Sequence, residues 1–132
     1  MNQRLPDLEV YIKCPDISVI QHWLAEQLPS LTLLKEKKGK PITYIYQADH
    51  NGQRLPIVLV EKAAGGFASL WIDSNQSPWD NDEALATVLI KQLGLEIRFA
   101  KGGWSEGDAE TEENETWIKL TPNGKREIQW QT

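Results

Sequence analysis

Short runs of alternating apolar and polar residues recur along the 132 residues, and this alternation limits most strongly what the chain can fold into. In residues 8–14, LEVYIKC, the side chains of Val10, Ile12 and Cys14 alternate with those of Glu9, Tyr11 and Lys13. A period of two is typical of a β-strand with two different faces. Further strand-like runs are residues 31–38, 41–48, 55–63, 67–74, 95–100, 115–120 and 126–131.

Two segments have apolar residues at the three-and-four spacing that gives a helix one apolar stripe. Asp16 is the expected N-cap of the first helix, which Pro29 ends. The second helix begins in the acidic stretch PWDNDE, where the helix dipole favours negative charge, and Gly94 is its expected C′ residue. The stripes comprise Ile17, Ile20, Leu24 and Leu28, and then Leu85, Val88, Leu89 and Leu93.

The predicted elements follow the order β-α-β-β-β twice. Several landmarks recur in the same sequence: LAEQLP matches LIKQLG, YIK matches WID, and Asn51-Gly52 matches Asn123-Gly124. Asn-Gly by itself is common in hairpins, because type I′ turns need positive φ at both central residues. We interpret the agreement of three landmarks as a duplication. The prediction is one α+β domain, residues 1–132, made of two repeats at about 5–63 and 66–132.

Composition excludes several classes of protein. Cys14 is the only cysteine and there are two histidines, so no disulfide can form within the chain and no close Cys/His metal spacing exists. No apolar run is long enough for a signal peptide or a membrane span, which predicts a cytoplasmic protein without a membrane partner. The best basic cluster is the short KEKKGK of residues 35–40, so we expect no nucleic-acid partner.

Charge is distributed unevenly between the halves. Residues 1–66 carry a net charge of +1, and residues 67–132 carry -6. Residues 105–115, SEGDAETEENE, contain six carboxylates and no basic residue. This segment is either a solvated loop between strands or a surface for a basic protein partner.

Tryptophan is frequent, with six residues in the chain. Trp23 lies one residue from the first helical stripe and is expected to pack in the core. Trp79 and Trp104 lie in loop-like sequence, where an aromatic side chain is either a lid or interface anchor or part of a small cluster under a loop.

Two β-α-β-β-β units in this length resemble the vicinal oxygen chelate superfamily, which includes glyoxalases, extradiol dioxygenases and bleomycin-resistance proteins. EVYIKCPD, residues 9–16, is similar to the opening of a family unit, and TPNGKREIQW, residues 121–130, is similar to its closing strand. The resemblance implies a cupped mixed sheet with two helices on its convex face. It also implies a site inside the cup and a homodimer.

Metal-using members place one ligand on the first and one on the last strand of each unit. Here the first slots hold Glu9 and Phe67, and the closing strands offer Glu61 and either Glu127 or Gln129. Phe67 cannot bind a metal, and carboxylates without histidine make a poor transition-metal site. We therefore expect no metal, no cofactor and no catalytic residue.

Metal-free members bind ligands in the same cup. Alternation places Glu9, Tyr11, Lys13 and Phe67, Ser69, Trp71, Asp73 on the side away from the helices. Aromatic faces with scattered carboxylates suit a flat or cationic organic ligand. The predicted ligand-binding residues are Glu9, Tyr11, Tyr44, Tyr46, Trp71, Trp104 and Trp117.

The leading hypothesis is a dimeric, metal-independent protein that binds a small organic molecule and is not an enzyme. The first alternative is an acidic interaction or immunity-type protein with a basic partner. The second is a glyoxalase-like enzyme with a degenerate metal site.

Overall fold

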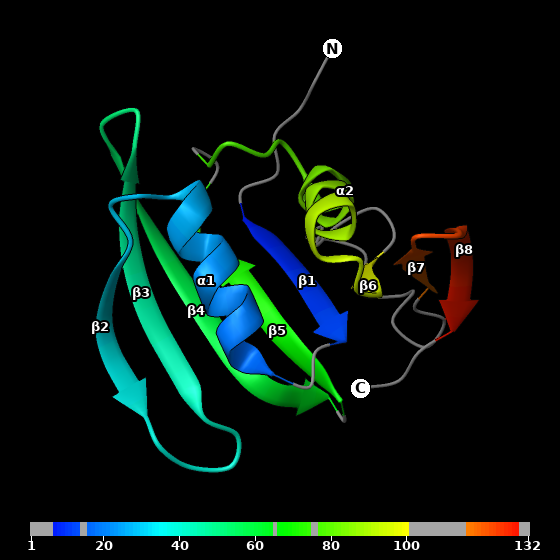
Figure 1. Ribbon diagram of the computed structural model, residues 1–132, viewed down its shortest axis with the longest axis horizontal. Coiled ribbons are helices and arrows are strands. Elements are labelled where there is room, and N and C mark those ends of the chain that lie inside the picture. The colour runs from blue at the N-terminus through cyan, green and yellow to red at the C-terminus, as the bar shows by residue number, and fades with distance from the viewer. Residues whose placement is uncertain (1–6, 14–15, 65, 75–76, 101–115, 130–132) are drawn as a thin grey trace, which may run out of the picture.

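A computed structural model describes residues 7–13, 16–64, 66–74, 77–100 and 116–129, which form two helices and eight strands (Figure 1). The first half comprises β1 (Leu8–Lys13), α1 (Ile17–Gln27), β2 (Thr32–Lys37), β3 (Thr43–His50) and β4 (Gln53–Ala64). The second half comprises β5 (Phe67–Ile72), α2 (Asp82–Leu93), β6 (Ile97–Ala100), β7 (Thr116–Thr121) and β8 (Gly124–Gln129). The α+β class and the predicted element order are confirmed.

The strands form one sheet in the order β2-β3-β4-β5-β1-β6-β7-β8. Every neighbouring pair is antiparallel, so the prediction of a mixed sheet is wrong. Each helical crossover, from β1 to β2 and from β5 to β6, joins strands that run in the same direction. However, three strands separate β1 from β2, and β1 itself separates β5 from β6. No two parallel strands therefore become neighbours.

The order of strands in the sheet does not repeat from one half to the other. β2 lies at an edge of the sheet, whereas β6, its counterpart in the second half, lies next to β1. The first strands of the two halves, β1 and β5, pair with each other at the centre. Both halves thus contribute to one continuous sheet.

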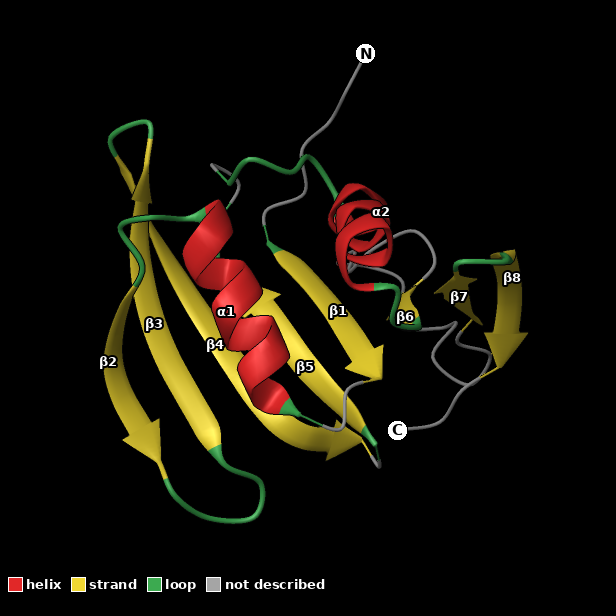
Figure 2. Cartoon of the chain, viewed as in Figure 1, coloured by secondary structure: helices red, strands yellow, loops and turns green. Residues whose placement is uncertain are grey.

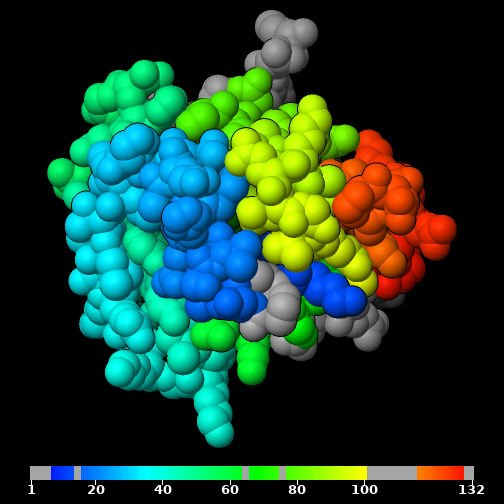
Figure 3. Space-filling model, in the orientation of Figure 1, coloured from blue at the N-terminus to red at the C-terminus, as the bar shows by residue number. Residues whose placement is uncertain are grey.

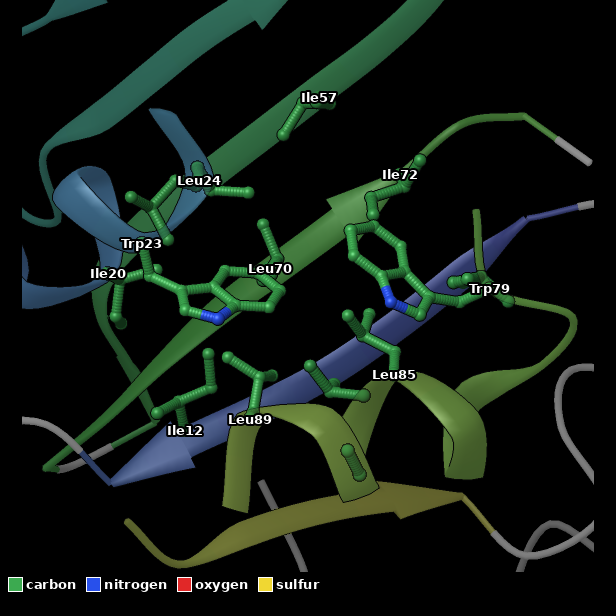
Figure 4. Packing of buried hydrophobic residues seen from close by; sticks show 14 of the residues in the cluster. Ile12, Ile20, Trp23, Leu24, Ile57, Leu70, Ile72, Trp79, Leu85 and Leu89 are labelled. Carbon is green, nitrogen blue, oxygen red and sulfur yellow. The ribbon is translucent and has the colours of Figure 1, made fainter. Parts of the chain in front are cut away.

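Both helices lie on one face of the sheet, and alternation correctly predicted which strand residues they cover (Figure 2). Val10 and Ile12 of β1 pair with Leu70 and Ala68 of β5, and all four side chains are buried. From the helices, Leu24 and the other stripe residues pack onto them, as Figure 4 shows for part of the core. The buried stripe residues are Ile20, Leu24, Leu28, Leu85 and Leu89.

Two tryptophans join the helices to each other above this layer. Trp23 of α1 stacks on Trp79, with ring centroids 5.6 Å apart (Figure 4), and its Nε1 donates a 2.7 Å hydrogen bond to Gln92 Oε1 of α2. α1 and α2 accordingly lie side by side in the space-filling view (Figure 3). Packing was the expected role of Trp23, and Trp79 is also part of the core rather than a lid.

The helix ends follow from local sequence. Asp16 caps α1 by accepting hydrogen bonds from the side-chain hydroxyl and the backbone N–H of Ser18, and these bonds lower the pKa of the Asp16 carboxyl. Asn81 caps α2 through Ala84 N–H at 2.8 Å. Gly94 ends α2 with φ of 69°, a left-handed conformation that glycine adopts without steric cost.

The two Asn-Gly pairs lie in different turns. Asn51 and Gly52 have φ of 53° and 80° and connect β3 to β4 as the two central residues of a hairpin, as predicted. In the second half, Thr121 pairs with Gly124, so the central residues are Pro122 and Asn123. The hairpin that the second Asn-Gly pair predicts is present, but its turn is shifted by one residue, so that Gly124 begins β8.

Within the described ranges, no helix is long and apolar enough to cross a membrane.

Leu33 and Leu34 of the edge strand β2 are about half exposed, whereas the central strands are buried on the helix side.

Replacing Leu70, which is fully buried, by alanine should lower the free energy of unfolding by about 2–5 kcal/mol, because the substitution leaves a cavity under both helices. The matched Leu34→Ala change on the exposed edge should alter it by less than about 0.5 kcal/mol. Urea denaturation followed by circular dichroism measures both. Similar losses for the two variants would contradict the assignment of the buried face.

Candidate functional site

The face of the sheet opposite the two helices, here called the helix-free face, carries the aromatic and charged side chains of the central strands. Strand pairing places Glu9 opposite Trp71, Tyr11 opposite Ser69, and Lys13 opposite Phe67. These side chains alternate with the buried apolar residues on the helix side, as a pleated strand requires. Trp117 of β7 lies on the helix-free face as well, because its ring contacts that of Tyr11.

Carboxylates lie at the end of this face where β1 begins. Ser69 Oγ donates a 3.3 Å hydrogen bond to Glu9 Oε2, and Trp71 Nε1 donates a 2.7 Å hydrogen bond to Asp7 Oδ2. Both bonds cross between β1 and β5 and fix the carboxylates beside the indole ring. Glu9 and Trp71 are half-buried, so each keeps part of its surface in contact with solvent.

Tyr11 and Trp117 form the aromatic centre. Their ring centroids are 5.5 Å apart and the rings are nearly perpendicular, an edge-to-face geometry that aromatic pairs favour. Burial and the nearby negative charge of Glu9 raise the pKa of the Tyr11 hydroxyl. The Tyr11 hydroxyl therefore stays neutral at physiological pH and the local charge is that of the carboxylates.

A cation lies on the far side of Tyr11. Arg98 of β6 is opposite Tyr11 in the strand register, and its guanidinium lies 4.6 Å from the centroid of the Phe67 ring. Its Nε also donates a 2.8 Å hydrogen bond to Glu96. The helix-free face thus runs from carboxylates through aromatic rings to an arginine that has its own ion pair.

Two predicted site residues lie on the other face. Tyr44 and Tyr46 pair with Leu59 and Ile57, whose side chains are in the core, so both tyrosines project toward the helices. Tyr46 is buried and its hydroxyl accepts a 2.8 Å hydrogen bond from Gln21 of α1. The expectation that they join the aromatic face is wrong.

Some predictions fall outside the described residues: Trp104, Cys14 and the acidic segment 105–115. That segment holds six of the twelve acidic residues of 67–132, and the remaining six equal the number of basic residues there. The predicted basic partner therefore depends on this segment and stays a prediction.

Asp82, the first residue of α2, is a site residue that the sequence did not indicate. Its side chain is 2 % exposed, and its Oδ1 accepts a 3.1 Å hydrogen bond from the backbone N–H of Glu9. Burial, together with the charges of Asp7 and Glu9, raises the pKa of the Asp82 carboxyl to about 7, against the lowering effect of that hydrogen bond. Asp7 was predictable from the alternation of β1, but Asp82 is 73 positions from Glu9 and only packing brings them together.

The slots inferred from metal-using relatives do not converge. Glu127 lies opposite Ile118 on the helix side of the sheet, whereas Glu9 and Phe67 lie on the helix-free face. Among the described residues, no three histidine, cysteine, aspartate or glutamate side chains are grouped closely enough to hold a metal ion.

A surface pocket of about 600 Å³ lies at the loop between β2 and β3, beside the end of β4. Its lining comprises Gly39, Lys40, Pro41, Ile42, Glu61 and Lys62. None of these residues belongs to the predicted ligand-binding set.

Comparison of the chain with protein-family models, with curated proteins and with solved structures finds no match.

The Asp82 carboxyl should make stability depend on pH. Its pKa rises from 3.8 to about 7 on folding, so the folded state holds a proton that the unfolded state loses, and stability falls between about pH 4 and 7. Above pH 7 the cost is constant, at up to about 4 kcal/mol. Asp82→Asn keeps the acceptor oxygen for Glu9 N–H and should recover much of this cost at pH 8.

Thermal and urea unfolding at pH 4, 6 and 8 measure the difference between Asp82→Asn and the wild type. The difference should grow from pH 4 to pH 8. Asp49→Asn, an exposed change, is the control and should give none of this pH dependence. A constant difference for Asp82→Asn would contradict the raised pKa.

Proposed function

We propose that the protein binds a cationic organic molecule on the helix-free face, over Trp71 and Tyr11, without a metal ion. The observation that carries this proposal is the position of Glu9. Its carboxylate is held by Ser69 beside Tyr11 on the same strand and opposite Trp71 on the next one. A positive group placed there meets a fixed carboxylate and two aromatic rings.

Two physical effects favour such a ligand. A cation over an aromatic face gains about 0.5–2 kcal/mol, and more where water is excluded. A charge-assisted hydrogen bond to a carboxylate contributes more than a neutral one. Trp71 supports both, since its Nε1 is occupied by Asp7 and its ring is therefore held in place beside a second carboxylate.

The proposal does not depend on kinship with the vicinal oxygen chelate superfamily. That kinship, the duplicated units and the convex placement of the helices stay predictions, as does a glyoxalase-like activity. The binding role rests on side chains of β1 and β5 whose register is defined by six paired residues. The proposed role is the binding of a small molecule rather than catalysis. The homodimer is a separate prediction, which sedimentation equilibrium tests.

The proposal predicts that planar, permanently charged compounds such as N-methylacridinium change the tryptophan fluorescence, while their uncharged analogues bind more weakly. Glu9→Gln should weaken binding about tenfold, because a charged contact becomes neutral while the side chain keeps its shape. Trp71→Leu should weaken it about 2- to 30-fold through loss of the cation–π contact. Isothermal titration calorimetry measures the affinities.

Two variants serve as matched controls. Glu83→Gln removes a carboxylate that pairs with Lys125 on the helix side, and Tyr44→Leu removes an aromatic ring from that side. Neither should change the affinity. Equal effects of Glu9→Gln and Glu83→Gln, or unchanged fluorescence across the compounds, would refute the proposal.

A further inference from the structure

The carboxyl of Asp82 accepts a backbone hydrogen bond from β1 at a position where a neighbouring strand would otherwise accept it. Lys13 N–H donates to Glu96 O at 2.9 Å, and Tyr11 pairs with Arg98, so β6 follows β1 over this stretch. At the next position in that alternation, the N–H of Glu9 donates to Asp82 Oδ1 instead. Since the bond is to a ladder N–H, the Asp82 carboxyl lies at the level of the sheet, beside the residue that carries the proposed ligand site.

The carboxyl of Asp82 uses only part of its hydrogen-bonding capacity in this position. Its side chain is 2 % exposed, and its second oxygen, Oδ2, has no hydrogen-bond partner among the described residues. A buried carboxylate with one free oxygen is costly in its ionised form. Its protonation state is therefore sensitive to neighbouring charge.

We infer that Asp82 couples ligand binding on the helix-free face to the release of a proton. This inference rests on the proposed function and adds regulation by pH to the same site. A cation bound beside Glu9 neutralises a negative charge that opposes ionisation of Asp82. Binding then favours the ionised carboxyl, and ionised Asp82 favours binding by the same factor.

The charges around Asp82 support this coupling. Asp7 and Glu9, on or beside β1, both raise its pKa, which lies near 7. Two other strands that pack against α2 also carry charged residues. At β6, Arg98 forms an ion pair with Glu96. Lys119 of β7 lies opposite Arg98 in the strand register, on the helix-free face. On α2 itself Glu83 pairs with Lys125 of β8. The carboxylates at the ligand site thus add to the effect of burial in opposing the ionisation of Asp82.

The consequence is a pH dependence of affinity with a defined direction. The affinity for a permanently charged ligand should rise about fivefold between pH 6 and pH 8, at the lower end of usual coupling between sites. Calorimetry at pH 7 in phosphate and in Tris, whose ionisation enthalpies differ, counts the protons released. The expected result is release of a fraction of one proton with N-methylacridinium.

Asp82→Asn provides the decisive comparison, because it retains the acceptor for Glu9 N–H and both histidines while removing the titrating group. The variant should bind the compound with little pH dependence and release no proton. Binding by the wild type without proton release, or equal release by Asp82→Asn, would overturn the inference and leave the proposed function intact.

A measurement without ligand tests the coupling even if no compound binds. Carboxyl carbon NMR reports the pKa of Asp82 in the wild type and in Glu9→Gln, where the neutral amide mimics a neutralised site. The pKa of Asp82 should be lower in Glu9→Gln and unchanged in Glu83→Gln. An unchanged value in Glu9→Gln would overturn the inference, whereas failure of binding alone would overturn the proposed function.

Discussion

The position of β1 between β5 and β6 is the constraint on which the rest of this structure depends. β1 is the one strand of the first half that lies beyond β5, and it joins β2–β5 to β6–β8 in one sheet. Its even-numbered residues Leu8, Val10 and Ile12 are fully buried under the helices. Its odd-numbered residues form the centre of the helix-free face. One strand of six residues therefore supplies both the middle of the core and the middle of the candidate site.

Because of this position, part of β1 lacks a neighbouring strand on the side of β6, and Asp82 supplies a hydrogen-bond acceptor there. β1 is paired along its whole length with β5, but its pairing with β6 is confined to the C-terminal half of the strand. A backbone N–H that is buried without an acceptor costs about 1–3 kcal/mol of folding free energy. Without Asp82, the N–H of Glu9 would lose its acceptor. The N-terminus of α2 brings a carboxyl to it, and the positive end of the helix dipole partly offsets the charge. A burial cost remains, which is visible in the raised pKa of Asp82.

Much of this fold was predictable because strand and helix periodicities are local. The faces of β1 and β5, the caps at Asp16 and Gly94, and the element order all follow from neighbouring residues. The order of strands in the sheet does not, since the same β-α-β-β-β order is compatible with several pairings. β3 shows where periodicity fails: Thr43, Ile45 and Gln47 are as mixed in polarity as Tyr44, Tyr46 and Ala48. Only its register with Leu59 and Ile57 of β4 decides which side is buried.

The candidate site likewise has residues that local sequence predicts and a contact that it does not. Glu9, Tyr11 and Trp71 were predictable because alternation along two strands places them on one face, whereas the contact between Asp82 and Glu9 spans 73 positions. That long-range contact is also what makes the site more than a surface patch. A charge that binds beside Glu9 lies next to the buried end of α2, where the free energy of ionisation is already nearly balanced at neutral pH. A cation beside Glu9 would therefore shift the protonation of a group inside the fold, because the negative charge of Glu9 opposes the ionisation of Asp82.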